Sequence, residues 1–228
     1  MNFVKFEEKI KIHFINKDLL KQAFLHRSYL NENRGSNLEH NERLEFLGDA
    51  VLELVVTEYL YKLFPKKPEG ELTAYRSALV NAVTLSKVAS EIDVNEYLLL
   101  SKGEAKDTGR ARQFILANTL EALIGALYLD QGYAVAKDFI TRFVLVLTEE
   151  IIRGGNWIDA KSSFQEKSQE KVSITPSYKS LEEKGPDHDK HFTVGVYLGA
   201  DEIARGTGKS KQDAEQDAAK NALLRKGW

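Results

Sequence analysis

The sequence predicts two domains, an all-α domain over residues 1–153 and a small α+β domain of order αβββα over residues 159–228, joined by a linker at 154–158. Three observations predict this division. Apolar residues recur at helical spacing in the segments up to residue 152. A glycine pair then follows Arg153, as in a connecting segment. Beyond it, residues 191–198 alternate between apolar and polar, which is typical of a strand.

The composition is that of an ordinary globular protein, with 43% hydrophobic residues and enough length for one sizeable core and a smaller one. The absence of cysteine excludes disulfides, thiolate metal sites and a cysteine nucleophile, and it fits a reducing cytoplasm, where we expect the protein to act. The first nine residues lack the apolar core of a signal peptide, and no apolar run approaches the roughly 20 residues of a membrane helix. Because the formal net charge is only -2, nucleic-acid binding has to be argued from where the charges lie.

The first domain is expected to be a series of helices with apolar faces, separated by polar turns. Asp18 is expected to cap the first helix, and a polar turn at 26–29 and a loop at 31–40 follow it. Residues 69–73 are expected to form a turn, and residues 101–110 a charged loop punctuated by glycine. The predicted helices cover residues 18–26, 41–64, 73–81, 83–92, 111–129 and 134–152.

Carboxylates interrupt the helix predicted at 41–64, whose core face is marked by apolar residues from Leu44 to Leu54. Glu45 and Asp49 are four residues apart, so both lie on one side of the helix, and Glu42 is three residues before Glu45. Like charges at this spacing repel, and burying them costs several kcal/mol each unless a positive charge compensates. A divalent cation would provide that compensation.

The helix predicted at 111–129 carries a matching pair, because Asn118 and Glu121 are three residues apart on another near-continuous apolar helix. Oxygen ligands on two apolar helices predict a Mg²⁺ site between them, and such sites serve in-line attack at phosphorus. The alternative for an isolated acidic pair is a solvated stripe on an amphipathic helix. Two matching sets favour the metal site.

The segment Asn41–Leu52, with the sequence NERLEFLGDAVL, resembles the signature helix of the ribonuclease III family, and Glu121–Ala126 matches the family's second acidic helix. The resemblance implies a Mg²⁺-dependent endonuclease, with Mn²⁺ as a substitute, that hydrolyses double-stranded RNA to 5′-phosphate and 3′-hydroxyl ends. It also implies ribosomal and messenger RNA precursors as substrates. The residues that it assigns to the site are the metal ligands Glu45, Asp49, Asn118 and Glu121, of which Asp49 and Glu121 are catalytic, and the supporting acid Glu42.

Asn118 departs from the family pattern, in which this position is usually Asp. An amide offers one neutral oxygen, so the site loses a unit of negative charge and its Mg²⁺ affinity should fall. Three explanations remain open: a natural variant that coordinates through its oxygen or a bridging water, an engineered change that traps an uncut complex, or a chain that lost catalysis and kept RNA binding. We favour the first, because Glu45, Asp49 and Glu121 are intact.

The second domain is predicted as a helix at 161–171, strands at 177–183, 191–198 and 201–208, and a helix at 209–224, and it resembles a double-stranded-RNA-binding domain. Such domains read duplex shape through 2′-hydroxyl and phosphate contacts, and lysines at a helix N-terminus attract phosphate. Gln212 stands where the family usually carries another lysine, so we expect a shallower salt dependence. The residues that the resemblance assigns to RNA contact are Gln165, Glu166, Pro186, His188, Lys209, Ser210 and Lys211.

The chain holds one copy of the acidic set, whereas a duplex has two strands to cut. We therefore expect a homodimer with two-fold symmetry, to which apolar surface around the signature helix contributes. Arg76 matches a basic position of the family, although a solvated surface charge explains it equally well. Two other functions remain open: a catalytically silent double-stranded-RNA-binding protein, favoured by Asn118, and an all-α interaction module whose acids are surface charges.

Overall fold

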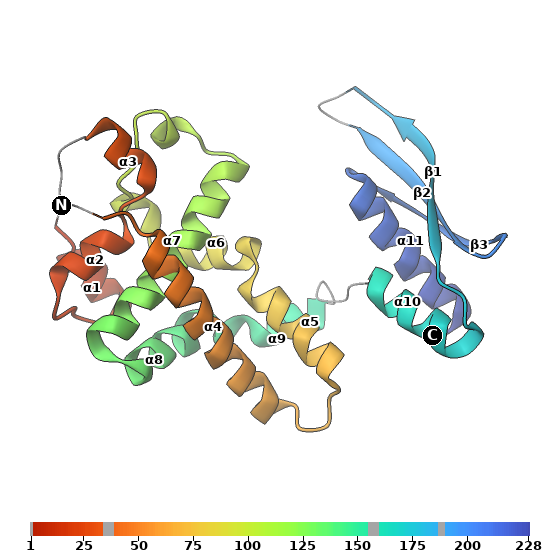
Figure 1. The fold of residues 1–228 in the computed structure, drawn as a ribbon, viewed down its shortest axis with the longest axis horizontal. Coiled ribbons are helices and arrows are strands. Elements are labelled where there is room, and N and C mark those ends of the chain that lie inside the picture. Colours follow the sequence, from red (N-terminus) through yellow and green to blue (C-terminus); the bar gives the residue numbers. More distant parts are fainter. Residues whose placement is uncertain (1, 34–38, 155–159, 187–189) are drawn as a thin grey trace. The chain divides into compact units, whose positions relative to one another are not determined.

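The computed structural model describes residues 2–33, 39–154, 160–186 and 190–228, and the chain divides into two compact units, Met1–Trp157 and Ile158–Trp228 (Figure 1). The first unit is helical and the second combines two helices with a three-stranded sheet, which confirms the predicted fold class. Across the described ranges, no helix has both the length and the apolar content needed to cross a lipid bilayer.

Two 22-residue helices, α4 (Glu42–Leu63) and α7 (Arg110–Gln131), form the centre of the first unit and make its most extensive helix–helix contact (Figure 1). Their apolar faces share one core with the surrounding helices. These are α1 (Val4–Ile10), α2 (Lys17–Ala23), α3 (Arg27–Glu32), α5 (Glu69–Val80), α6 (Ala82–Glu91), α8 (Tyr133–Phe143) and α9 (Thr148–Gly154), with short 3₁₀ turns η1 (Val94–Tyr97), η2 (Glu104–Lys106) and η3 (Leu145–Leu147).

Two glycines set the distance between α4 and α7. A Cβ added to Gly48 would lie 1.8 Å from the Glu121 carbonyl oxygen, and one added to Gly125 would lie 2.2 Å from the Leu44 carbonyl oxygen. Both distances are far below van der Waals contact, so the two backbones touch here only because neither residue has a side chain. This close approach places the first half of α4, with its carboxylates, directly against the middle of α7.

The expected cap at Asp18 is wrong. Helix α2 begins at Lys17, because the side chain of Asn16 in an extended conformation accepts a 3.0 Å hydrogen bond from the Asp18 N–H. The turn expected at 26–29 is also wrong, since α3 begins within it and His26 is its N-cap.

Two further helix boundaries differ from the prediction. Residues 69–73 are the first turns of α5 rather than a turn, with Pro68 in the extended N-cap position. The helix expected over 134–152 is interrupted near Val144, where a 3₁₀ turn separates α8 from α9. No glycine or proline marks this break in the sequence.

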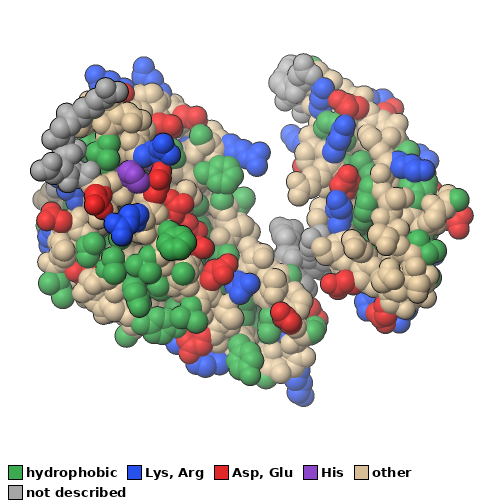
Figure 2. Space-filling view, in the orientation of Figure 1, with side chains coloured by type: hydrophobic (Ala, Val, Ile, Leu, Met, Phe, Trp, Pro, Cys, Tyr) green, Lys and Arg blue, Asp and Glu red, His purple; other side chains and the backbone are tan. Residues whose placement is uncertain are grey.

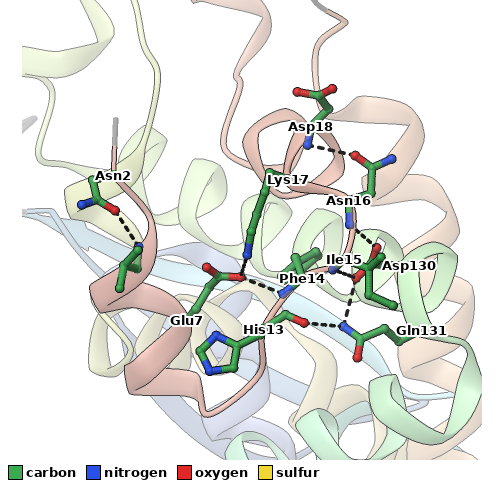
Figure 3. Close-up of polar contacts among 11 residues, drawn as sticks. Asn2, Glu7, His13, Phe14, Ile15, Asn16, Lys17, Asp18, Asp130 and Gln131 are labelled. Atoms are coloured by element: carbon green, nitrogen blue, oxygen red, sulfur yellow. Dashed lines mark hydrogen bonds and ion pairs between the residues drawn. The ribbon is translucent and has the colours of Figure 1, made fainter.

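Side-chain hydrogen bonds attach the N-terminal segment to the end of α7 (Figure 3). Asp130 accepts hydrogen bonds from the N–H groups of Ile15 and Asn16, at 2.8 and 2.7 Å. Glu7 is buried, and its carboxylate is satisfied by the Phe14 N–H and by Lys17 Nζ (Figure 3). Because both partners compensate its charge, burying the Glu7 carboxylate costs little free energy. Glu7 therefore holds the segment between α1 and α2 in place.

The second unit runs α10 (Ala160–Val172), β1 (Ser177–Lys184), β2 (His191–Leu198), β3 (Asp201–Gly208) and α11 (Lys211–Lys226). The strands form an antiparallel sheet in the order β1-β2-β3, with an irregularity near Leu181. Its core joins Phe164 of α10 to the sheet and to the buried alanines of α11. A Cβ added to Gly206 would lie 2.0 Å from the Ala218 nitrogen, so small residues on both sides let α11 lie close to β3.

Polar side chains of α11 also cover the free edge of β3. Asp217 accepts a 2.8 Å hydrogen bond from the Thr207 N–H, Asn221 Nδ2 donates to the Arg205 carbonyl, and Arg225 donates to the Ile203 carbonyl. The three side chains are four residues apart and so share one stripe of the helix. They satisfy strand groups that would otherwise be open to pairing with another chain.

Candidate functional site

The carboxylates predicted to bind metal meet where α4 and α7 touch. Glu45 and Asp49 lie on successive turns of α4 on either side of Gly48, and the backbone of Glu121 is the group that Gly48 contacts. The side chain of Asn118, one turn before Glu121, hydrogen-bonds Glu45. Figure 2 shows acidic side chains gathered along the face of the first unit over which α4 runs. Glu45, Asn118 and Glu121 are partly buried, whereas Asp49 is exposed.

These carboxylates repel one another across the two helices. Burial, together with the charges of Asp49 and Glu45, raises the pKa of Glu121 to about 8. Burial and neighbouring Glu42 raise the pKa of Glu45, which the hydrogen bond from Asn118 partly offsets. Partial desolvation and Glu53 raise the pKa of Asp49. In the described part of the chain, no cationic side chain is among the groups that shift these three pKa values.

The donor set fits a divalent cation in chemistry, because it consists of hard oxygen ligands in a site short of positive charge. The described residues do not, however, hold three or more Asp, Glu, His or Cys side chains already gathered as a ready metal cluster. The carboxylates are close enough to perturb one another, and they would have to turn toward a shared ion.

A cavity of about 290 Å³ opens beside this cluster, and only part of the predicted site lines it. Glu42, Glu45 and Asn118 are at its wall, whereas Asp49 and Glu121 are not. The remaining lining residues, which the sequence reasoning did not select, are His26, Asn41, Phe114 and Ile115. Helical spacing could have indicated Asn41, Phe114 and Ile115, which precede Glu45 or Asn118 by three or four residues, but not His26, which comes from a separate segment of the chain.

The carboxylate of Glu42 already lies close to two basic side chains beside the cavity. Arg27 Nη1 lies 3.3 Å from one of its carboxylate oxygens and His40 Nδ1 lies 3.8 Å from the other. These contacts suit the supporting role predicted for Glu42 better than direct coordination. Arg76, for which two roles were open, donates a 3.0 Å hydrogen bond to the Thr57 hydroxyl of α4.

In the second unit, the residues predicted to contact RNA are solvent-facing where the structure describes them. Gln165 and Glu166 are exposed on α10, and Pro186 is exposed after β1. His188 lies outside the described residues. The ion pair between Lys161 and Glu215, at 2.6 Å, holds the first turn of α10 beside the first turns of α11.

The start of α11 is organised around Ser210. Its hydroxyl accepts a 3.1 Å hydrogen bond from the Asp213 N–H, so Ser210 is the N-cap of the helix. Lys209 and Lys211 flank it and are exposed, and Lys211 Nζ lies 5.8 Å from the centre of the Phe192 ring. Two lysines beside a helix N-terminus form an electropositive surface suited to phosphate.

Comparison with known proteins identifies both units. Residues 16–147 match the model of the Ribonuclease-III-like family, and residues 160–226 match the double-stranded RNA binding motif. Ribonuclease 3 of Borreliella burgdorferi is 47% identical over 221 residues, which cover 96% of this chain and 89% of the relative. Ribonuclease 3 of Enterococcus faecalis is 47% identical over 219 residues, covering 95% and 94% of the two chains.

The fold of the first unit has a solved counterpart. The nuclease domain of ribonuclease III from Campylobacter jejuni superposes with a TM-score of 0.58 and 40% sequence identity, covering 63% of this chain and 96% of that domain. That structure was described in connection with flexibility in the region involved in dimer formation. The chain therefore belongs to the ribonuclease III family and is an endoribonuclease, with a nuclease domain followed by a double-stranded-RNA-binding domain.

Proposed function

We propose that this endoribonuclease hydrolyses double-stranded RNA with Mg²⁺ held by Glu45, Asp49 and Glu121, and that the products carry 5′-phosphate and 3′-hydroxyl ends. The observation that carries the proposal is the close contact of α4 with α7 at Gly48, which brings the acids of α4 beside Glu121, and burial together with their charges raises the pKa of Glu121 to about 8. Carboxylates that repel one another at a contact between two helices are stabilised by a shared cation. Mg²⁺ is the preferred ion because every donor is a hard oxygen, and Mn²⁺ is its natural substitute.

A bound divalent cation would supply an activated water and neutralise charge on the phosphate. The protein's own contribution is to position the carboxylates. Gly48 and Gly125 hold α4 against α7, so Glu45 and Glu121 are kept beside each other at little conformational cost. Asn118 supplies a neutral amide that orients Glu45 through a hydrogen bond and offers its oxygen to the ion or to a bridging water.

The proposal includes a homodimer, because cutting both strands of a duplex needs two acidic clusters. An apolar stripe on α4 supports it: Phe46, Leu54 and Tyr61 are 81%, 58% and 73% exposed. Leu54 was expected in the core, and its exposure corrects that expectation. Figure 2 shows hydrophobic side chains gathered on the face of the first unit along α4. Large exposed apolar patches usually mark an interface, and a two-fold dimer is the commonest arrangement.

The RNA-binding domain would contact the duplex through Gln165 and Glu166, through Pro186 and His188 after β1, and through the lysines at the start of α11. Because the Ser210 hydroxyl caps α11, Lys209 and Lys211 would make the main phosphate contacts. We place the activity in the cytoplasm, because a chain without cysteine suits a reducing compartment. Ribosomal and messenger RNA precursors are the substrates that membership of the family suggests.

The test is incubation of the full-length chain with a long, perfectly paired RNA duplex and Mg²⁺, with product lengths and end groups read after electrophoresis. We expect short duplex products with 5′-phosphate ends from the wild type. Glu121→Ala should abolish cleavage and retain duplex binding. Glu91→Gln is the matched control, since Glu91 is an exposed carboxylate of α6.

A second function, a silent RNA-binding protein, is favoured by Asn118 alone. It predicts duplex binding without cleavage in either Mg²⁺ or Mn²⁺. Cleavage by the wild type that disappears in Glu121→Ala would exclude it. Equal products from the wild type and Glu121→Ala would instead contradict the proposed site.

A further inference from the structure

The cavity beside the carboxylate cluster has an unused hydrogen-bond donor, and it belongs to His26. The cavity wall carries the polar residues His26, Asn41, Glu42, Glu45 and Asn118. The amide of Asn41 donates to the Ala23 carbonyl at 3.0 Å, and the amide of Asn118 is bonded to Glu45. Both glutamates bring negative charge. Each amide keeps a second N–H group, but among the described residues both side-chain contacts of His26 are made by Nδ1, so its Nε2 has no hydrogen-bond partner within the chain.

The backbone around His26 is held in place from two directions. Its N–H donates to the Leu99 carbonyl at 3.1 Å, and a β-bridge joins Leu25 to Leu99. The Asn41 N–H donates to the Leu25 carbonyl at 2.9 Å, which attaches the same segment to the start of α4. His26 is thus fixed relative to the helix that carries Glu45, although it is distant from that helix in the sequence.

The tautomer of the imidazole follows from its contacts. His26 Nδ1 lies 2.8 Å from Ser28 Oγ and 3.3 Å from the Ser28 nitrogen. A backbone N–H can only donate, so Nδ1 accepts from the Ser28 N–H and carries no proton. The Ser28 hydroxyl, which accepts a 3.0 Å hydrogen bond from the Ser101 N–H, then donates its own hydrogen to Nδ1. Nδ1 is an acceptor in both contacts, which leaves the proton on Nε2. Burial also lowers the pKa of His26, although Glu104 and Glu42 oppose this, so the ring is favoured in its neutral form.

We propose that the Nε2–H group of His26 donates a hydrogen bond to a phosphate oxygen of the RNA strand at the cleavage site. A phosphate entering this cavity meets mainly carboxylates, which repel it, and a fixed neutral donor beside them gives it a defined position. A donor that carries no charge does this without competing with a cation for the carboxylates. Ser28 and Ser101 act as positioning residues, because they set the tautomer and the orientation of the ring. The inference rests on the proposed nuclease site.

Two other roles for His26 make different predictions. A metal ligand would have to offer a lone pair on Nε2, so its loss would be compensated by raising the Mg²⁺ or Mn²⁺ concentration. A purely structural residue would lower the stability of the fold when replaced. If His26 donates a hydrogen bond to phosphate, excess metal ion should not restore activity and the stability of the fold should not fall. The cleavage rate should instead depend on whether the new side chain places an N–H group where Nε2 lies.

The test compares His26→Asn with His26→Gln in the full-length chain. The Asn side chain reaches the place of Nδ1 and loses the donor in the cavity, whereas the Gln side chain can place an N–H group near the position of Nε2. His13→Asn is the matched control, because His13 is an exposed histidine on the connection between α1 and α2. The measurements are the single-turnover cleavage rate of a perfectly paired duplex at saturating Mg²⁺, the unfolding midpoint, and duplex affinity in a Glu121→Gln background.

We expect His26→Asn to slow cleavage by roughly 10–100-fold, as for the loss of a hydrogen bond to a charged group. His26→Gln should restore much of the rate, and His13→Asn should match the wild type. Duplex affinity and the unfolding midpoint should stay close to wild type in all three. The inference is overturned if His26→Asn cleaves as fast as the wild type, if excess metal ion restores its rate, or if both His26 variants lose rate and stability together. A wild-type chain that does not cleave would overturn the proposed function itself.

Discussion

Glu121 is held in the folded chain partly buried and beside two other carboxylates, and this raises its pKa. Because its pKa is raised to about 8 in the folded chain, the folded state favours the protonated carboxyl more than the unfolded state does. The resulting stability is fully present below the ordinary pKa of a glutamate. It is lost as the pH rises through about 8.

Glu121→Gln should therefore stabilise the metal-free protein at alkaline pH. We expect its free energy of unfolding at pH 9 in a chelator to exceed that of the wild type by roughly 1–3 kcal/mol, with little difference at pH 4. Added Mg²⁺ should stabilise the wild type and leave the variant unchanged. Denaturant unfolding across this pH range checks both statements. A wild-type stability that rises between pH 5 and pH 9 relative to Glu121→Gln would contradict them.

Asn118 is the residue whose replacement should improve the site. Asn118→Asp exchanges a neutral amide for a carboxylate, which adds a charged oxygen ligand but removes the hydrogen bond to Glu45. We expect the Mg²⁺ concentration needed for half-maximal cleavage to fall by about tenfold, because hard cations prefer anionic oxygen. Mg²⁺ titration of the cleavage rate measures this. An unchanged titration curve would remove position 118 from the metal site.

At the scale of the elements, the contact between α4 and α7 decides whether the carboxylates meet. Gly48→Ala places a methyl group 1.8 Å from the Glu121 carbonyl oxygen, so the helices have to separate. We expect a loss of about 1–3 kcal/mol or more in the free energy of unfolding, together with loss of cleavage. Chemical denaturation and the duplex assay measure the two effects.

Gly70→Ala is the control for this prediction. A Cβ at Gly70, in the first turn of α5, meets nothing within 4 Å. That substitution should be neutral or stabilise by about 0.4–1 kcal/mol, since alanine loses less backbone entropy on folding. If Gly48→Ala proved as harmless as Gly70→Ala, the close helix contact would not be what holds the site together.

The sequence was sufficient to predict the helices in which apolar residues recur with a clear helical period. Helical spacing placed α4 and α7, and the carboxylate spacing placed Glu45 and Asp49 on one side of α4. It did not predict which apolar residues of α4 are buried, because a helix that is apolar on most faces does not distinguish a core from an interface. Leu54 was therefore expected in the core but is 58% exposed.

Other features depend on contacts that no local pattern contains. His26 reaches the cavity through a bridge between Leu25 and Leu99, which are far apart in the sequence. The break at Val144, where a 3₁₀ turn separates α8 from α9, has no glycine or proline to mark it. The cap of α2 was expected at Asp18 but is Asn16, and because both are good capping residues, residue type alone does not decide between them.

At the scale of the whole molecule, the apolar stripe on α4 is the feature that sets the expected assembly. Phe46→Glu places a charge at the residue of α4 that is 81% exposed, so it should disrupt a dimer without disturbing the core. We expect sedimentation at micromolar concentration to show a dimer for the wild type and a monomer for Phe46→Glu. The monomer should bind duplex RNA and be defective in cutting both strands together.

Val83→Glu is a suitable control for the dimer, because Val83 is 65% exposed on α6 rather than on α4. It should sediment like the wild type. A wild-type chain that is monomeric at these concentrations would exclude the proposed assembly and leave the nuclease site itself unaffected.

The central claim is that carboxylates of α4 and α7 hold one divalent cation between them. Mn²⁺ binding to the full-length chain, measured by electron paramagnetic resonance, tests it without relying on activity. Glu45→Gln on α4 and Glu121→Gln on α7 should each weaken Mn²⁺ binding by roughly tenfold or more, while Glu91→Gln binds like the wild type. If Glu45→Gln and Glu121→Gln both bound Mn²⁺ as tightly as the wild type, the two helices would not share an ion.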